Sequence, residues 1–509
     1  MRQNLKATLA VLLAVMLLAA CGQVNAQQSA EGRHLTIVTP TLPISMDPSG
    51  ANEPASSMVN RHLYSTLVRL DYETFEPYPN LAVSWDMPDA STVNMQLRQG
   101  VLFHNGERLT ARDVQFSLER GAVSPPTRII LDVISHVEVH DDYNFTVHLR
   151  TPFAPIMRHL GHAVAGIVHA NTVKAAGDDY ASHPIGTGPF MFSELHIGNR
   201  LELVRFDDFW GDLPQISGIT FRLVPDASGR LMEIEVGTAD IANMIAAPDV
   251  AVAEASPNVN LMRRLNLTTT YIGFNTKRAP FDNPLVRQAI HYALDTELIV
   301  DTVFFGVGQP ARGPIADNVW GFHEPEPFPT NIDRARELLA QAGHADGFNT
   351  EFWWNIPDQQ RSDVAEIVHN ILRDLNINVS IVSMELSVYM ERTNAGEHPG
   401  MFIMGWGTIT GDADYGLFPC FHTSAHGAPG NRTFYSNPQL DALLEAGRSE
   451  LDDAARMEIY RQALEIIRND SPWIPLHRGE WVLAVSPDIR GLDLHPGGHH
   501  VFSNIYFDN

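Results

Sequence analysis

The sequence predicts a mixed α/β fold, because segments with the periodicity of strands and of helices alternate along its whole length. The segments 34–39 and 93–97 alternate apolar and polar residues, which is typical of half-buried strands. Elsewhere, apolar residues recur every three or four positions, as on one face of an amphipathic helix. A chain of 509 residues has room for two or three domains with large cores.

Local signals mark individual elements. Asp141 and Asp142 form a turn signal between the strand-like segments 137–139 and 145–149, so we predict a hairpin there. Thr110 begins a helix that Gly121 is expected to end, with an acidic residue three positions after the threonine. Three further amphipathic helices are predicted from their apolar faces, which comprise Val286, Ala289, Ile290, Ala293 and Leu294; Val364, Ile367, Val368, Ile371, Leu372 and Leu375; and Ile459, Tyr460, Ala463, Ile466 and Ile467.

The N-terminus is typical of a secretory signal peptide, here residues 1–20. Arg2 and Lys6 precede an apolar stretch that is too short to span a membrane comfortably. The tetrad 18–21, Leu-Ala-Ala-Cys, resembles the bacterial lipobox, in which the cysteine becomes the lipid-modified first residue of the mature chain. We therefore expect an extracytoplasmic protein, held on a membrane through Cys21 and a polar tether over residues 21–33. The alternative is an ordinary signal peptide that contains a cysteine.

Composition excludes some classes of protein. Cys21 and Cys420 are the only cysteines, so a lipid on Cys21 leaves Cys420 as a lone thiol and no disulfide. The formal net charge is −25, and it falls to −27 when Arg2 and Lys6 are removed with the signal peptide. Such a charge repels nucleic acid, which is bound through basic patches.

Four separated segments together carry a resemblance to one family. They are residues 97–118, 186–190 (Gly-Thr-Gly-Pro-Phe), 273–290 and 471–476 (Ser-Pro-Trp-Ile-Pro-Leu). In order and spacing they resemble the family 5 extracellular solute-binding proteins, which serve ABC importers of dipeptides, oligopeptides, glutathione, nickel and some sugars. The resemblance extends from about residue 34 to the end of the chain.

The resemblance implies a two-lobed clam shell with an additional inserted domain. The first lobe would comprise residues 34–65, 185–275 and 485–509, the inserted domain residues 66–184, and the second lobe residues 276–484. The lobes would close on a short peptide or a glutathione-like solute, and the closed form would deliver it to an ABC permease. We expect a monomer that is not an enzyme and carries no cofactor.

The segment after the apolar run 401–404 is the main candidate for ligand contacts. The run is predicted to be a buried strand, and ligands of open α/β sheets bind beyond the carboxyl ends of strands. We expect a flexible loop in which Trp406 packs on the ligand beside Tyr415, and Asp412 or Asp414 holds its ammonium group. The alternative is a surface turn with solvated acids and a core tryptophan.

The resemblance also indicates where this chain departs from dipeptide-binding members. Those members carry an aspartate three residues after the tryptophan, where this chain has Ile409, and an arginine for the peptide carboxylate, where it has Asn355. The nearest arginine to that position is Arg361. The pattern of residues 410–416 is more similar to the glutathione-type branch, and Arg432 is then a candidate carboxylate clamp, or else a surface ion pair.

Further candidates come from strand-like segments. Trp353 and Trp354 face opposite ways if they lie on a strand, so one is expected in the core, and Trp354 is a candidate cleft residue. Tyr271 and Asn275 flank an expected crossing between the lobes, where they would contact ligand or build the hinge.

Two other functions are alternatives to peptide binding. The chain has no GxxxxGK[ST], HExxH or GxSxG motif, which leaves a hydrolase as a remote alternative. Nickel or haem binding within the same importer class is the nearer alternative, because histidine imidazoles are good ligands for such metals. The histidines of the tail are nevertheless expected to be solvated, and no metal site is assigned. The histidines concerned are His422, His426, His495, His499 and His500.

Overall fold

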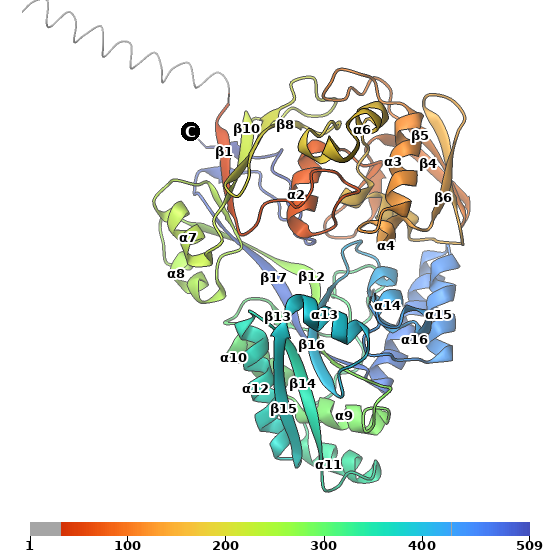
Figure 1. Cartoon of the computed structure of the whole chain (residues 1–509), viewed down its shortest axis with the longest axis vertical. Coiled ribbons are helices and arrows are strands. Elements are labelled where there is room, and N and C mark those ends of the chain that lie inside the picture. The colour runs from red at the N-terminus through yellow and green to blue at the C-terminus, as the bar shows by residue number, and fades with distance from the viewer. Residues whose placement is uncertain (1–31, 429, 509) are drawn as a thin grey trace, which may run out of the picture.

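The computed structural model describes residues 32–428 and 430–508. Cys21, the predicted signal peptide and nearly all of the tether lie outside the described residues. Figure 1 shows an upper half, residues 32–259 and 486–508, and a lower half, residues 275–472. Two long antiparallel strands, β12 (Asn260–Phe274) and β17 (Trp473–Val485), join the halves. The predicted mixed α/β class is confirmed.

One sheet runs through both halves. Its eleven strands lie in the order β15-β14-β16-β12-β17-β11-β1-β10-β9-β8, with β13 paired to β17 off this path. The strands of the upper half are β1 (His34–Thr39), β8 (Phe190–His196), β9 (Arg200–Arg205), β10 (Gly218–Leu223) and β11 (Ile241–Asn243). Those of the lower half are β13 (Gln309–Pro310), β14 (Phe348–Ile356), β15 (Ile377–Glu385) and β16 (Met401–Gly407).

The connection between the halves lies in the middle of β12 and β17. The start of β12 pairs with the end of β17, and from Thr268 onward β12 also pairs with β16. Between Leu265 and Thr269 the register of β12 against β17 shifts. The irregular pairing therefore falls where the sheet passes from one half to the other.

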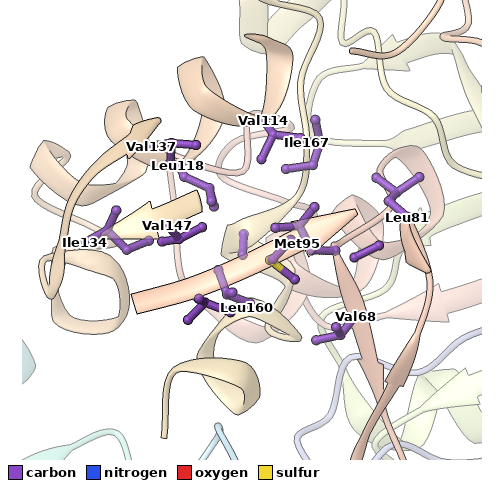
Figure 2. Packing of buried hydrophobic residues seen from close by; sticks show 14 of the residues in the cluster. Val68, Leu81, Met95, Val114, Leu118, Ile134, Val137, Val147, Leu160 and Ile167 are labelled. Carbon is purple, nitrogen blue, oxygen red and sulfur yellow. The ribbon is translucent and has the colours of Figure 1, made fainter. Parts of the chain in front are cut away.

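A separate four-stranded sheet builds the right-hand part of the upper half in Figure 1. It comprises β4 (Ala82–Asp89), β5 (Thr92–Leu97), β7 (Asn144–Leu149) and β6 (Ile134–Val139), in that order. The β6–β7 hairpin is confirmed, and α3 (Ala111–Val123) begins with the expected capping box. Gly121 does not end α3; it is buried, and a Cβ there would lie 2.7 Å from the Leu131 side chain. Figure 2 shows the core between α3 and this sheet, with Met95, Val114 and Val147 pointing inward.

Helices cover the rest of the main sheet. The three amphipathic helices expected in the lower half are confirmed as α9, α12 and α16. The lower half contains α9 (Pro284–Ala293), α10 (Thr296–Val303), α11 (Ile332–Gln341), α12 (Gln359–Arg373), α13 (Leu386–Asn394), α14 (Ala413–Phe421), α15 (Pro438–Ser449) and α16 (Asp453–Asp470). The upper half contains α2 (Pro54–Leu63), α4 (Arg128–Leu131), α5 (Ile156–Leu160), α6 (Ala170–Ala176), α7 (Ala227–Glu235) and α8 (Val250–Glu254), together with short strands β2 (Val68–Leu70) and β3 (Pro77–Pro79). Among residues 32–428 and 430–508, none of the helices combines the length and apolar character that a membrane span needs.

The C-terminal tail returns to the upper half and packs against α2. It carries the short pair β18 (Ile489–Arg490) and β19 (Tyr506–Phe507). Phe502 stacks on His62 of α2 with ring centroids 5.2 Å apart. The expectation that the tail histidines are solvated is wrong, because His495, His499 and His500 are buried.

Candidate functional site

The segment after β16 is a strand followed by a turn and a buried helix. Met401–Met404 is a buried strand, as predicted. The flexible loop expected after it is instead a short turn that leads into α14, and Asp412 is the N-cap of this helix. The Asp412 carboxylate accepts a hydrogen bond of 3.0 Å from the backbone N–H of Asp414. Two acids near a strand end therefore mark a helix start here.

Asp412 is enclosed by two arginines. Arg456 of α16 donates to both carboxylate oxygens, at 2.6 and 2.9 Å, and Arg158 of α5 lies 3.4 Å away. Burial opposes the charged form most strongly, but the charges of Arg456 and Arg158 outweigh it and hold the pKa of Asp412 below its ordinary value. The Asp412 side chain is fully buried and has no face open to solvent in this structure. Its role in binding the ammonium group of a ligand therefore remains a prediction.

Asp414 has a comparable partner in Arg448 of α15. The guanidinium donates to its two oxygens at 2.8 and 3.2 Å, and the Asp414 side chain is buried. The backbone carbonyl of Arg448 accepts a 2.6 Å hydrogen bond from the backbone N–H of Ala154 in the upper half. Arg448 therefore holds the start of α14 through its side chain and contacts the upper half through its backbone. A ligand-binding role for Asp414 also remains a prediction.

Trp406 and Tyr415 are brought together where the two halves meet. The Trp406 indole donates a 2.9 Å hydrogen bond to the Tyr415 carbonyl, and the two rings lie 5.8 Å apart. Trp406 packs against the core of the upper-half sheet and also against the core beneath α14. Burial raises the pKa of the Tyr415 phenol, while the side chain of Asn52 acts in the opposite direction. Asn52, which directly precedes the N-cap of α2, is a contact that the sequence did not indicate.

The other predicted arginines are engaged inside the lower half. Arg432 is buried and donates to the side chain of Asn394 at 2.8 Å. Arg361 donates to the side chain of Asn355 and lies 3.1 Å from Asp358. Arg432 therefore does not lie in a surface ion pair, and the ligand roles of both arginines remain predictions.

Asn275 and Trp354 also lie in the lower half, and Tyr271 lies on the connecting strand β12. Tyr271 is fully buried and stacks on Trp473 with ring centroids 3.4 Å apart. Asn275 donates to the backbone carbonyl of His398 at 2.7 Å, just beyond the end of β12. Trp353 and Trp354 do face opposite ways, with Trp353 in the core and Trp354 partly buried against the other face. The ligand roles proposed for these residues remain predictions.

Metal ligands do not converge in the part of the chain that the structure describes. Within residues 32–428 and 430–508, no three side chains of His, Cys, Asp or Glu are placed to hold one ion. His422 lies 3.3 Å from Glu445, and His426 bonds to the Tyr435 carbonyl at 2.9 Å. Cys420 is buried, as a lone structural thiol is expected to be, and burial raises its pKa far above the ordinary value.

Comparison with known proteins identifies the family. The profile of the bacterial extracellular solute-binding proteins, family 5 (middle), matches residues 76–428. The chain belongs to this family. It is therefore an extracytoplasmic solute-binding protein of the kind that serves ABC importers, and its relatives are binding proteins rather than enzymes.

Individual relatives cover nearly the whole chain. The heme-binding protein A of Haemophilus influenzae is 29% identical over 552 aligned residues, which cover 99% of this chain and 100% of that protein. The glutathione-binding protein GsiB of Pectobacterium atrosepticum is 30% identical over 466, covering 89% of this chain and 90% of the relative.

Solved structures give the same fold. HbpA2 from Haemophilus parasuis superposes with a TM-score of 0.85 at 28% identity, covering 94% of this chain and all of that one. The DppA protein of Helicobacter pylori, in complex with the peptide STSA, superposes with a TM-score of 0.80 at 27% identity, covering 96% of this chain and all of the other.

Proposed function

We propose that this family 5 protein captures short peptides or glutathione-like solutes outside the cytoplasmic membrane. The observation that carries the proposal is the position of Trp406, which packs against the cores of both halves. A solute held at that place is contacted by both halves, so its binding favours the form in which the halves are together. Relatives named for glutathione binding and a structural neighbour holding a peptide favour this class of cargo.

The proposal includes the arrangement of the domains. The first lobe comprises residues 34–65, 185–275 and 485–509, the inserted domain residues 66–184, and the second lobe residues 276–484. Support comes from β12 and β17, the two strands that connect the halves within one sheet. The chain acts as a monomer that presents its closed form to an ABC permease.

Isothermal calorimetry tests the cargo. We expect glutathione or a di- to pentapeptide to bind wild type, and Trp406→Ala to weaken binding by roughly a hundredfold through lost packing. Trp210→Ala is the matched control, because Trp210 is also partly buried, packs against the same upper-half core and donates to a backbone carbonyl, that of Thr187 at 3.2 Å. Equal losses of affinity in Trp406→Ala and Trp210→Ala would show that Trp406 is not a specific ligand contact.

Haem or nickel is the second candidate cargo. It is favoured by the relative named heme-binding protein A, which aligns over 99% of this chain. The same calorimetry, run with haem and with nickel, separates the two candidates. Tight metal or haem binding that His422→Ala or His426→Ala abolishes, with no heat from any peptide, would replace the peptide proposal.

The anchor is proposed from the sequence around Cys21. We infer that residues 1–20 are removed as a signal peptide and that Cys21 carries lipid. Cys21→Ser then yields a protein released from the membrane that still binds its ligand, because the tether precedes the first strand. Intact mass spectrometry of the membrane-extracted wild type checks this, and a mass without lipid contradicts it.

A further inference from the structure

Five buried histidines form a cluster where the C-terminal tail, residues 486–508, packs on the upper half. The tail directly follows β17, and its apolar side chains belong to the core of the upper half. Each of the five histidines is at most 2% exposed. They are His62 of α2, His162 in the segment after α5, and His495, His499 and His500 of the tail.

Two of the tail histidines accept hydrogen bonds from backbone N–H groups of the tail itself. Nδ1 of His495 accepts from the N–H of Gly497 at 2.9 Å, and Nδ1 of His500 accepts from the N–H of His495 at 3.0 Å. A backbone N–H can only donate, so each of these ring nitrogens presents its lone pair. A second proton on either ring would place two donors against each other. Both hydrogen bonds therefore require neutral imidazoles.

His62 attaches the tail to α2 in the same way. Its Nδ1 donates to the Met58 carbonyl at 2.8 Å, and its Nε2 accepts from the backbone N–H of Phe502 at 3.0 Å. The carbonyl fixes the ring proton on Nδ1, so Nε2 is the atom that a second proton would occupy. That proton would remove the hydrogen bond between α2 and the tail.

The docked tail disfavours protonated histidine at every position of the cluster. The His499 ring lies 3.8 Å from that of His495 and 5.4 Å from that of His162, measured between ring centroids. Burial lowers the pKa of His62 to about 4, and that of His162 and His500 to about 3. Burial and then neighbouring positive charge lower the pKa of His495 and His499 well below the ordinary value.

The charged groups around the cluster do not offset additional positive charge. Arg61 of α2 and Arg264 of β12 are the neighbouring cations, and both lower the pKa of histidines in the cluster. Asp493 and Glu73 lie 3.2 and 2.7 Å from the guanidinium of Arg264, with which they already form ion pairs. The ring of Tyr72 packs on the cluster, and burial raises the pKa of its phenol, which stays neutral.

We propose that the C-terminal tail is an acid-sensitive latch, which is docked on α2 while these histidines are neutral and detaches when they take up protons. This inference goes beyond the proposed function and does not depend on the cargo. A protein outside the cytoplasmic membrane is exposed to the pH of its surroundings, so the latch would make the upper half responsive to acid.

The direction of the pH dependence follows from the two states of the tail. In a detached tail the imidazoles are hydrated, and their pKa returns to about 6.5. Docking is therefore fully favoured above about pH 6.5, and it weakens as the pH falls from there toward the docked pKa values of about 3 and 4. Within that window each histidine lowers the ratio of docked to detached tail by up to about tenfold per pH unit. Five histidines acting together make the change steep.

Hydrogen exchange of the full chain, followed by mass spectrometry, tests the latch between about pH 7.5 and about pH 4. Each rate is corrected for the intrinsic pH dependence of exchange. We expect residues 486–508 to lose protection at a higher pH than the strands of the main sheet. A tail that stays protected at the lowest pH overturns the inference. Loss of protection in the tail and in the sheet at one common pH overturns it too, because that result is global acid unfolding.

Two variants test whether the histidines cause the release. In His500→Asn and His62→Gln, the side-chain amide oxygen can accept the same backbone N–H but does not titrate. Each variant should keep the tail docked at neutral pH and take up about one proton fewer on release. Removing one of five equal contributions should lower a midpoint near pH 5 by about 0.4 pH unit.

His183→Asn is the control, because His183 is an exposed histidine of the upper half. It should change neither the midpoint of release nor its steepness. If His500→Asn and His62→Gln also release the tail with the midpoint and steepness of wild type, the histidines do not drive release and the inference is overturned. If the tail of one variant is already detached at neutral pH, the other variant and the wild-type titration still decide.

None of these outcomes bears on ligand binding, so the latch can fail while the proposed function stands.

Discussion

At the scale of single residues, the acids near β16 were found from the sequence but their partners were not. The order of a buried strand, a tryptophan and two aspartates indicated that this segment matters. Asp412 is bound by Arg456, which is 44 positions away, and by Arg158, which is 254 positions away. No local pattern connects residues so distant in the chain. The sequence therefore allows a ligand-binding role for these acids but does not exclude a structural one.

Asp412→Ala should destabilise the protein strongly. The substitution leaves Arg456 buried without its ion-pair partner and leaves Arg158 with Glu76 alone, and breaking a buried pair costs about 3–5 kcal/mol. Urea unfolding measures the loss. Asp333→Ala is the control, because Asp333 forms an exposed ion pair with Arg336 and its removal should change stability little. If both variants lose little unfolding free energy and only Asp412→Ala loses ligand affinity, Asp412 is a ligand-binding residue and not a structural one.

The same pair gives a pH dependence. Because the folded pKa of Asp412 lies below its ordinary value, its contribution to stability is fully present above the unfolded pKa of about 3.9. That contribution is lost as the pH falls through the lower folded value. The difference in unfolding free energy between wild type and Asp412→Ala should therefore stay constant from pH 7 to about pH 5, and decrease only below about pH 4.

At the scale of elements, the sequence predicted those helices and strands that carry a cap or a regular apolar face. The capping box of α3 and the turn of the β6–β7 hairpin are local signals, and both were read correctly. Helix α14 gives no such signal, because Pro419 lies inside it and almost all of its side chains are buried, which leaves no polar face to reveal a helical period. The tail gives a misleading signal for a related reason, since its glycines and histidines are typical of loops while their burial depends on α2.

At the scale of the whole molecule, periodicity could not predict how the chain is divided. The main sheet mixes strands from residue 34 to residue 485, and only the resemblance to a family indicated such a discontinuous arrangement.

Closure of the two halves should depend on a few contacts across their boundary. In this structure Arg158 of the upper half lies 3.4 Å from Asp412 of the lower half, and the backbone N–H of Ala154 donates to the Arg448 carbonyl. Phe75 packs so closely on Gly411 that a Cβ there would lie 2.1 Å from its ring. These contacts exist only while the halves are together, so they favour the closed form whether or not a solute is present.

Arg158→Gln should therefore shift the ligand-free protein toward an open form. X-ray scattering should give a larger radius of gyration for this variant than for wild type, and a saturating ligand should bring both to the same smaller value, because differential affinity for the closed form sets the populations. Arg312→Gln is the control, since its ion pair with Glu324 is exposed and lies wholly within the lower half. A radius of gyration that neither the ligand nor Arg158→Gln changes would contradict hinged closure, and the protein would then have to capture its solute in a rigid site.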